Sequence, residues 1–158
     1  MNFTPLPCCV KEKIYIILLF LILTACGFEL EKNLNTTNFY ISEIKTIGDK
    51  RINYLIKNYL LNTSKSDQNR AISLEINTKK IKTIGEKNIK NEATKYQIQI
   101  DVIVKFNNDG KDNQIIISEI GEYSVHDQYS QTLSRERKLI ENLTNEISEM
   151  IVLELSKY

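Results

Sequence analysis

The sequence has little with which to build a catalytic or metal centre. It contains one histidine (His126), no tryptophan and five glycines, which are scattered singly. Cysteine and histidine do not cluster at metal-ligand spacing, and there is no glycine-rich phosphate loop or G-x-S-x-G elbow. Asp127 follows His126, but adjacent residues on a strand point to opposite faces. We therefore expect no enzymatic activity, no cofactor and no metal.

Cysteine and proline are both missing from most of the chain. The three cysteines are Cys8, Cys9 and Cys26, and the two prolines are Pro5 and Pro7. Residues 27–158 therefore cannot form a disulfide and contain no proline-rich linker. Long apolar runs are also missing: Ile14–Leu23 is ten residues long, whereas a membrane-spanning helix needs about 20.

This short apolar run has the features of an export signal. Lys11 and Lys13 precede it, and the small residues Thr24 and Ala25 follow it, directly before Cys26. A basic flank, a 7–15-residue apolar segment and small residues at a cleavage site are typical of secretory signals. An uncleaved buried segment with an incidental cysteine is the alternative.

The tetrapeptide "LTAC" that ends in Cys26 resembles the lipobox of bacterial lipoproteins. This resemblance implies that residues 1–25 are a signal peptide, that Cys26 is the lipidation site, carrying diacylglyceryl and a palmitate-type acyl chain, and that residues 26–37 are a lipidated tether. Several acyl chains anchor a protein stably, whereas one does so only marginally. Gly27, rather than an aspartate, follows Cys26, which favours the periplasmic face of the outer membrane over inner-membrane retention.

Residues 38–158 are expected to form a single domain. Outside the signal peptide the chain has 19 basic and 19 acidic residues, so overall charge predicts no nucleic-acid partner. Hydrophobic periodicity predicts a strand over 38–46, a helix over 50–61 capped by Asp49, strands over 72–76, 98–106 and 114–125, and a closing helix over 132–156. A slip in the alternation near Gly121 indicates a β-bulge.

This order, β-α-β-β-β-α, predicts an α+β two-layer sandwich. A four-stranded, mostly antiparallel sheet would carry both helices on one face. The strand over 98–106 has the clearest pattern, with an apolar face that alternates with a polar one. Its predicted core residues are Ile98, Ile100, Val102, Val104 and Phe106. The first strand returns through a helix, which allows it to lie parallel to its neighbour.

Positive charge gathers between the second and third predicted strands. The segment 79–95 contains six lysines and two glutamates. It reads either as a solvated hairpin tip or as a tip that binds an anion such as a lipid phosphate. The candidate residues for binding lipopolysaccharide are Lys79, Lys80, Lys82, Lys87, Lys90 and Lys95.

A second group of cations lies in the first turns of the closing helix. Arg135, Arg137 and Lys138 stand where the helix dipole disfavours positive charge. Either tertiary packing tolerates this cost, or these side chains face an anionic ligand or partner. They are the secondary basic candidates.

The segment "LTACGFEL" resembles the start of the LPS-assembly lipoprotein family LptE (RlpB), in which Gly-Phe follows the lipidated cysteine. The segment "ATKYQIQIDVIVKF" is similar to a strand of that family, and "YSQTLSRERKLIENLTNEISEMIVLEL" to its closing helix. The resemblance implies an outer-membrane lipoprotein that plugs and supports the lipopolysaccharide-export β-barrel and binds lipopolysaccharide. The alternative is a periplasm-facing adaptor lipoprotein of another envelope transport or secretion complex.

Overall fold

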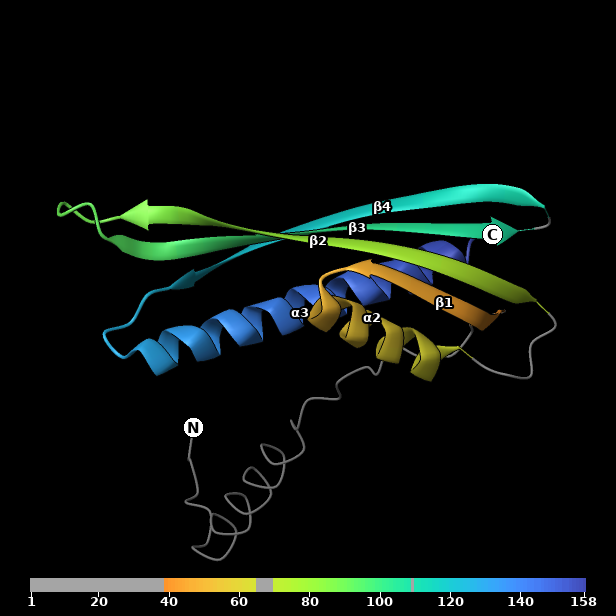
Figure 1. The fold of residues 1–158 in the computed structure, drawn as a ribbon, viewed down its shortest axis with the longest axis horizontal. Helices are drawn as coiled ribbons and strands as arrows, with labels where there is room; N and C mark the ends of the chain where they lie inside the picture. Colours follow the sequence, from red (N-terminus) through yellow and green to blue (C-terminus); the bar gives the residue numbers. More distant parts are fainter. Residues whose placement is uncertain (1–38, 65–69, 109) are drawn as a thin grey trace, which may run out of the picture. The chain divides into compact units, whose positions relative to one another are not determined.

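The computed structural model describes residues 39–64, 70–108 and 110–158. The elements are β1 (Tyr40–Gly48), α2 (Lys50–Thr63), β2 (Ala71–Lys87), β3 (Ala93–Asn108), β4 (Lys111–Ser124) and α3 (Tyr129–Leu155). The strands form one sheet in the order β1-β2-β3-β4; β1 runs parallel to β2, and the other pairs are antiparallel. Both helices cover the same face of the sheet (Figure 1). The predicted α+β sandwich and the parallel first strand are confirmed.

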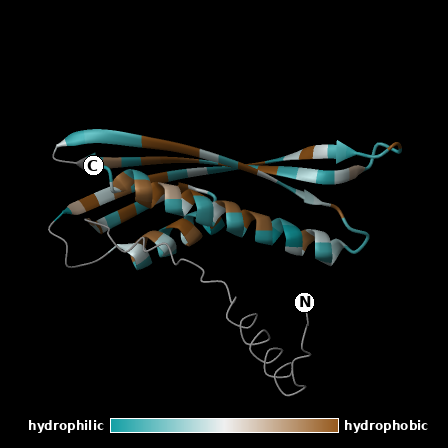
Figure 2. Ribbon diagram, turned by 180° about the vertical axis from the view of Figure 1, so that it is seen from behind, coloured by the Kyte–Doolittle hydropathy of each residue, from teal (hydrophilic) through white to brown (hydrophobic). Residues whose placement is uncertain are grey.

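The core lies between the sheet and the helices. Every second residue of β3 from Ile98 to Phe106 is buried, as the alternation predicts. Figure 2 shows apolar and hydrophilic residues alternating along the strands. Burial of one large aliphatic side chain contributes roughly 1.5–3 kcal/mol, so this strand anchors the domain.

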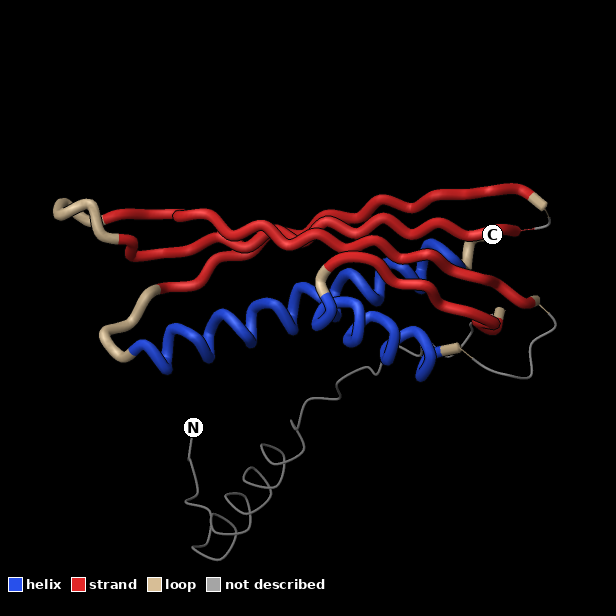
Figure 3. Tube along the Cα trace, in the orientation of Figure 1, coloured by secondary structure: helices blue, strands red, loops and turns tan. Residues whose placement is uncertain are grey.

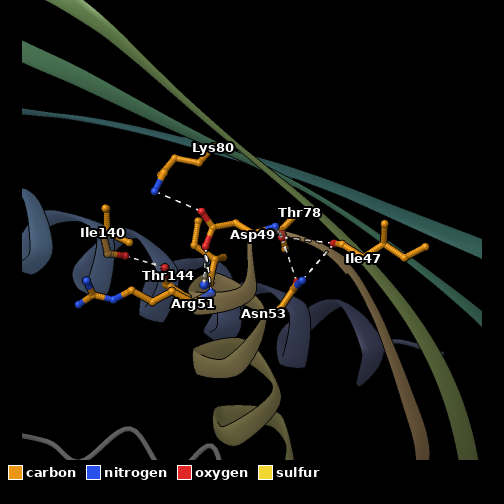
Figure 4. A network of polar contacts seen from close by, with 9 residues as sticks. Ile47, Asp49, Arg51, Asn53, Thr78, Lys80, Ile140 and Thr144 are labelled. Carbon is orange, nitrogen blue, oxygen red and sulfur yellow. Dashed lines mark hydrogen bonds and ion pairs between the residues drawn. The ribbon is translucent and has the colours of Figure 1, made fainter.

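A polar network fixes the junction between β1 and α2 (Figure 4). The Asp49 carboxylate accepts hydrogen bonds from the backbone amides of Arg51 and Ile52, the N-cap role expected of it. Thr78 of β2 accepts from the Asp49 amide and donates to Asn53 of α2, each at 3.0 Å. Asn53 in turn donates to the Ile47 carbonyl at 3.1 Å. The start of α2 is therefore tied to both β1 and β2.

The apolar stripe of α3 also follows the prediction, but two polar residues are buried within it. Thr144 and Ser148 are fully buried. Their hydroxyls donate to the carbonyls one turn earlier, from Thr144 to Ile140 at 2.6 Å and from Ser148 to Thr144 at 2.7 Å. Because these bonds satisfy the hydroxyls inside the helix, the small side chains can face the core without an unpaired polar atom.

The predicted bulge at Gly121 is wrong. Pairing of β4 with β3 is continuous through Gly121, which lies opposite Ile98. Glu119 and Gly121 simply occupy inward positions where the pattern expects apolar residues. Gly121 leaves room for α3, since a Cβ atom there would lie 2.6 Å from Leu139 Cδ1. The register shifts lie instead in β1, between Ile41 and Glu43, and near the end of β2.

The lysine-rich segment is not the hairpin tip that the sequence suggested. The last β1–β2 pair is Gly48–Thr78, yet β2 runs on to Lys87 and pairs with β3 (Figure 3). Cross-strand pairing and ion pairs with other elements hold this lysine-rich stretch in the sheet. The connection between β2 and β3 is therefore only residues 88–92.

Candidate functional site

The six candidate lysines are spread over both faces of the sheet and the β2–β3 turn. Lys79, Lys80 and Lys82 lie within β2, and Lys87 ends it. Lys90 lies in the turn, and Lys95 lies in β3. Alternation along β2 sends Lys80 and Lys82 toward the helices and Lys79 toward the uncovered face. The structure therefore does not bring the six ammonium groups together.

Lys80 and Lys82 each pair with an acidic residue on the helix side. Lys80 Nζ lies 3.2 Å from a carboxylate oxygen of Asp49, and Lys82 Nζ lies 2.7 Å from Glu136 of α3. These contacts neutralise two of the candidate charges. They also tie β2 to the starts of both helices, which is a structural role.

Glu136 is the centre of a compact cluster beneath the sheet. It accepts hydrogen bonds from Lys82 and from the Tyr123 hydroxyl, both at 2.7 Å. Lys82 Nζ lies 4.4 Å from the ring centroid of Tyr96, which stacks on Tyr123. Partial burial opposes charge on Glu136 and on Lys82, but their hydrogen bonds outweigh it. The pKa of Glu136 is therefore lowered and that of Lys82 is raised.

The β2–β3 turn is ordered by its own side chains. The Asn88 carboxamide accepts hydrogen bonds from the amides of Lys90 and Glu92, and Lys87 donates to Asn91. Lys95 pairs with Glu86 at 2.8 Å. The charges at this end are thus partly balanced within the hairpin.

The basic group on α3 is joined by an arginine that sequence reasoning missed. Arg135, Arg137 and Lys138 are all exposed. Arg137 and Lys138 line an open hollow together with Arg51 of α2, while Arg135 lies outside it. A spacing of more than 80 residues separates Arg51 from the other two cations. Only the packing of α2 against α3 could reveal this grouping.

The uncovered face of the sheet is polar, with a row of three isoleucines and one asparagine across it. Ile47, Asn77, Ile103 and Ile116 lie opposite one another on the four strands. Ile116 is 69% exposed. Around this row the polar side chains bond to each other: Ser118 donates to Asp101 at 2.6 Å and Gln99 donates to Asp101 at 2.7 Å. These bonds and the nearby Lys79 lower the pKa of Asp101.

Among residues 39–64, 70–108 and 110–158 there is no group of three or more His, Cys, Asp or Glu placed to hold a metal ion. Within the same ranges, no helix combines the length and the apolar character that crossing a membrane requires. His126 and Asp127 follow β4 rather than lying on it, and both line a hollow beside Tyr96 and Glu136. Cys26 and the tether lie outside the described residues.

The architecture defines the class of fold: an α+β sandwich with both helices on one face of a four-stranded sheet and the other face uncovered. The crystal structure of rare lipoprotein B from Shewanella oneidensis shares it, with a TM-score of 0.58 and 13% identity over 73% of this chain and 94% of that chain. The solution structure of a lipoprotein B from Nitrosomonas europaea matches with a TM-score of 0.53 and 11% identity over 82% and 90% of the two chains. No protein-family model and no curated protein sequence matches. At these identities the likeness establishes the fold, and it agrees with the resemblance in the sequence.

Proposed function

We propose that this chain is a lipid-anchored outer-membrane lipoprotein of the lipopolysaccharide transport complex, which plugs and supports the export β-barrel and binds lipopolysaccharide. The observation that carries the proposal is the fold shared with rare lipoprotein B, over nearly all of that protein. The lipobox-like "LTAC" agrees with it, because a lipidated cysteine is what the lipoprotein assignment requires.

The uncovered sheet face supports a barrel partner. Large outer-membrane barrels have a polar interior. This face presents carboxamides, hydroxyls and charged groups; Gln99, Asp101 and Ser118 are hydrogen-bonded to each other, and exposed isoleucines supply apolar contact area among them. A surface of this kind would fit a polar wall whose own groups pair with the remaining donors and acceptors.

The first test concerns the anchor. Replacing Cys26 with alanine removes the thiol that accepts the lipid. We expect the C26A chain to remain an uncut, unlipidated precursor, as measured by mass spectrometry and metabolic labelling with palmitate. Normal processing and labelling of this variant would refute the lipoprotein assignment.

The second test concerns the partner. The tagged lipoprotein, purified from detergent-solubilised outer membrane, should bring a large β-barrel protein with it. Ile116→Lys should reduce this recovery, because it places a charge in the contact face. Leu153→Lys is the matched control, since Leu153 is exposed on α3. Recovery of an inner-membrane transporter or its periplasmic arm would favour an adaptor lipoprotein instead.

A further inference from the structure

The packing of α2 against α3 creates a basic hollow whose cations form no ion pair with the described residues. Three cationic residues, Arg51, Arg137 and Lys138, line it, and Ser134, Glu141, Asn142 and Asn145 complete its wall. We call it the α2–α3 hollow. Its volume is about 540 Å³, within the range of small-molecule sites.

The hollow differs from the lysine-rich strand in how its charges are compensated. Lys80, Lys82 and Lys95 each form an ion pair. In the part of the chain that the structure describes, none of the three cations of the hollow forms one, although Glu141 lies on the same wall. Three cations against one carboxylate leave an uncompensated positive charge in a concave surface.

The positions of these residues make the grouping a consequence of the fold. The α3 residues of the hollow recur at intervals of three and four, which places them on one face of the helix. Arg51 comes from the first turn of α2, and Figure 4 shows its side chain extending from the start of that helix. The Asp49 carboxylate caps this turn by accepting hydrogen bonds from the backbone amides of Arg51 and Ile52. The backbone position from which the Arg51 side chain extends is therefore held in place.

The chemistry of the wall selects a phosphate group. Arginine donates two parallel hydrogen bonds to a phosphate, and lysine adds a point charge. The carboxamides of Asn142 and Asn145 and the Ser134 hydroxyl can donate further hydrogen bonds to phosphate or sugar oxygens. We infer that the α2–α3 hollow binds a phosphate group carried by an amphiphile headgroup. This inference rests on the proposed function for the identity of the amphiphile, a phosphorylated lipid A.

The test compares two sets of charge removals in the full chain purified in detergent. The hollow variant is R51Q/R137Q/K138Q. The control is K50Q/K57Q/K111Q, which removes the same charge from exposed lysines outside the hollow that, within the described residues, form no ion pair. The probes are lipid A with two phosphates, and its dephosphorylated form, in mixed micelles at about 0.15 M salt.

The hollow variant should bind the phosphorylated probe at least about tenfold more weakly, as expected for the loss of charge-assisted hydrogen bonds. Binding of the dephosphorylated probe should not change, and the control should stay within about twofold of the wild type. R51K/R137K keeps the charge but removes the forked donors, so it should show a smaller loss. The urea midpoint of each variant should match the wild type, because all substituted residues are exposed.

Three results would overturn the inference: unchanged binding in the hollow variant, an equal or larger loss in the control, or a wild type that does not distinguish the two probes.

Competition with inorganic phosphate distinguishes the two possible sources of the ligand, free phosphate and the phosphate of a lipid headgroup. Displacement of the lipid A probe by millimolar phosphate would show that the hollow recognises the phosphate group alone. No displacement would show that it recognises phosphate as part of the lipid headgroup. Recovery of the β-barrel is measured on the same preparations. A wild type that recovers the barrel but fails the probe test refutes the hollow alone.

Discussion

At the level of single residues, burial separates isoleucines that look equivalent in the sequence. Ile100 of β3 is fully buried, whereas Ile116 of β4 lies on the uncovered face. The alternation along residues 98–106 was sufficient to predict this for β3. It was not sufficient for β4, where three isoleucines stand in succession at 115–117.

We expect Ile100→Ala to lower the free energy of unfolding by about 2–5 kcal/mol, because it leaves a cavity in a packed core. Ile116→Ala should change it by less than about 0.5 kcal/mol, as exposed substitutions usually do. Urea unfolding of the two purified variants measures both values. Equal losses would mean that the two faces of the sheet are assigned wrongly.

Buried polar residues are where reading the sequence fails at this scale. Asn53, Thr78, Thr144 and Ser148 are buried, yet nothing in a hydrophobicity pattern marks them. Each is satisfied by a partner, whether one turn earlier in α3 or at the junction of β1, β2 and α2. Only the three-dimensional pairing makes their burial tolerable.

At the level of elements, the order and type of every helix and strand in the described residues followed from periodicity and capping. The main error concerned β2, because lysine is depleted in strands and its run was taken for a connection. Pairing with the regular β3 and ion pairs to Asp49 and Glu136 extend the strand through that run. The same error hid the fact that Lys80 and Lys82 face the helices.

The junction between β1 and α2 depends on one glycine. Gly48 has a φ of 102°, and a Cβ atom there would lie 1.9 Å from the Thr78 carbonyl oxygen. Gly110 also has a positive φ, 78°, but nothing lies within 4 Å of its added Cβ. A substitution at Gly110 therefore tests backbone strain alone, whereas a substitution at Gly48 adds a steric clash to that strain.

Gly110→Ala should cost about 1–2 kcal/mol of unfolding free energy, the price of the left-handed conformation alone. Gly48→Ala should cost more, above about 3 kcal/mol, because the β1–β2 backbones must also separate. Thermal and urea unfolding of the two variants provide the comparison. A Gly48→Ala variant as stable as Gly110→Ala would contradict the close approach of Gly48 to Thr78.

At the level of the whole molecule, the candidate site could be predicted only in part. The cations of α3 were identified from their place in the sequence, but Arg51 was not, since it belongs to another helix. The sequence also did not indicate that Asp49 and Glu136 form ion pairs with Lys80 and Lys82. Charge counted along the sequence located the basic segments, and the packing of the helices decides which charges are left without a partner.

Three carboxylates connect the stability of the whole domain to pH. Asp49, Asp101 and Glu136 have pKa values lowered in the folded state. For Asp49, as for Glu136, burial opposes ionisation and hydrogen bonds overcome it. A carboxyl group whose pKa is lower in the folded than in the unfolded state stabilises the fold above its unfolded pKa, about 3.9–4.3. This contribution is lost as the pH falls through the folded-state pKa.

We therefore expect the free energy of unfolding to be steady near neutral pH and to decrease below about pH 4. Glu136→Gln should lower it by about 1 kcal/mol at pH 7, a modest value because Lys82 is partly exposed. The variant and the wild type should then converge as the pH approaches about 2, since both carry an uncharged group at this position. Glu75→Gln is the control: its pair with Lys105 is more exposed, so it should change stability by less than about 0.5 kcal/mol. Urea unfolding across this pH range tests the prediction, and a constant difference between Glu136→Gln and the wild type at every pH would show that the charge of Glu136 does not stabilise the fold.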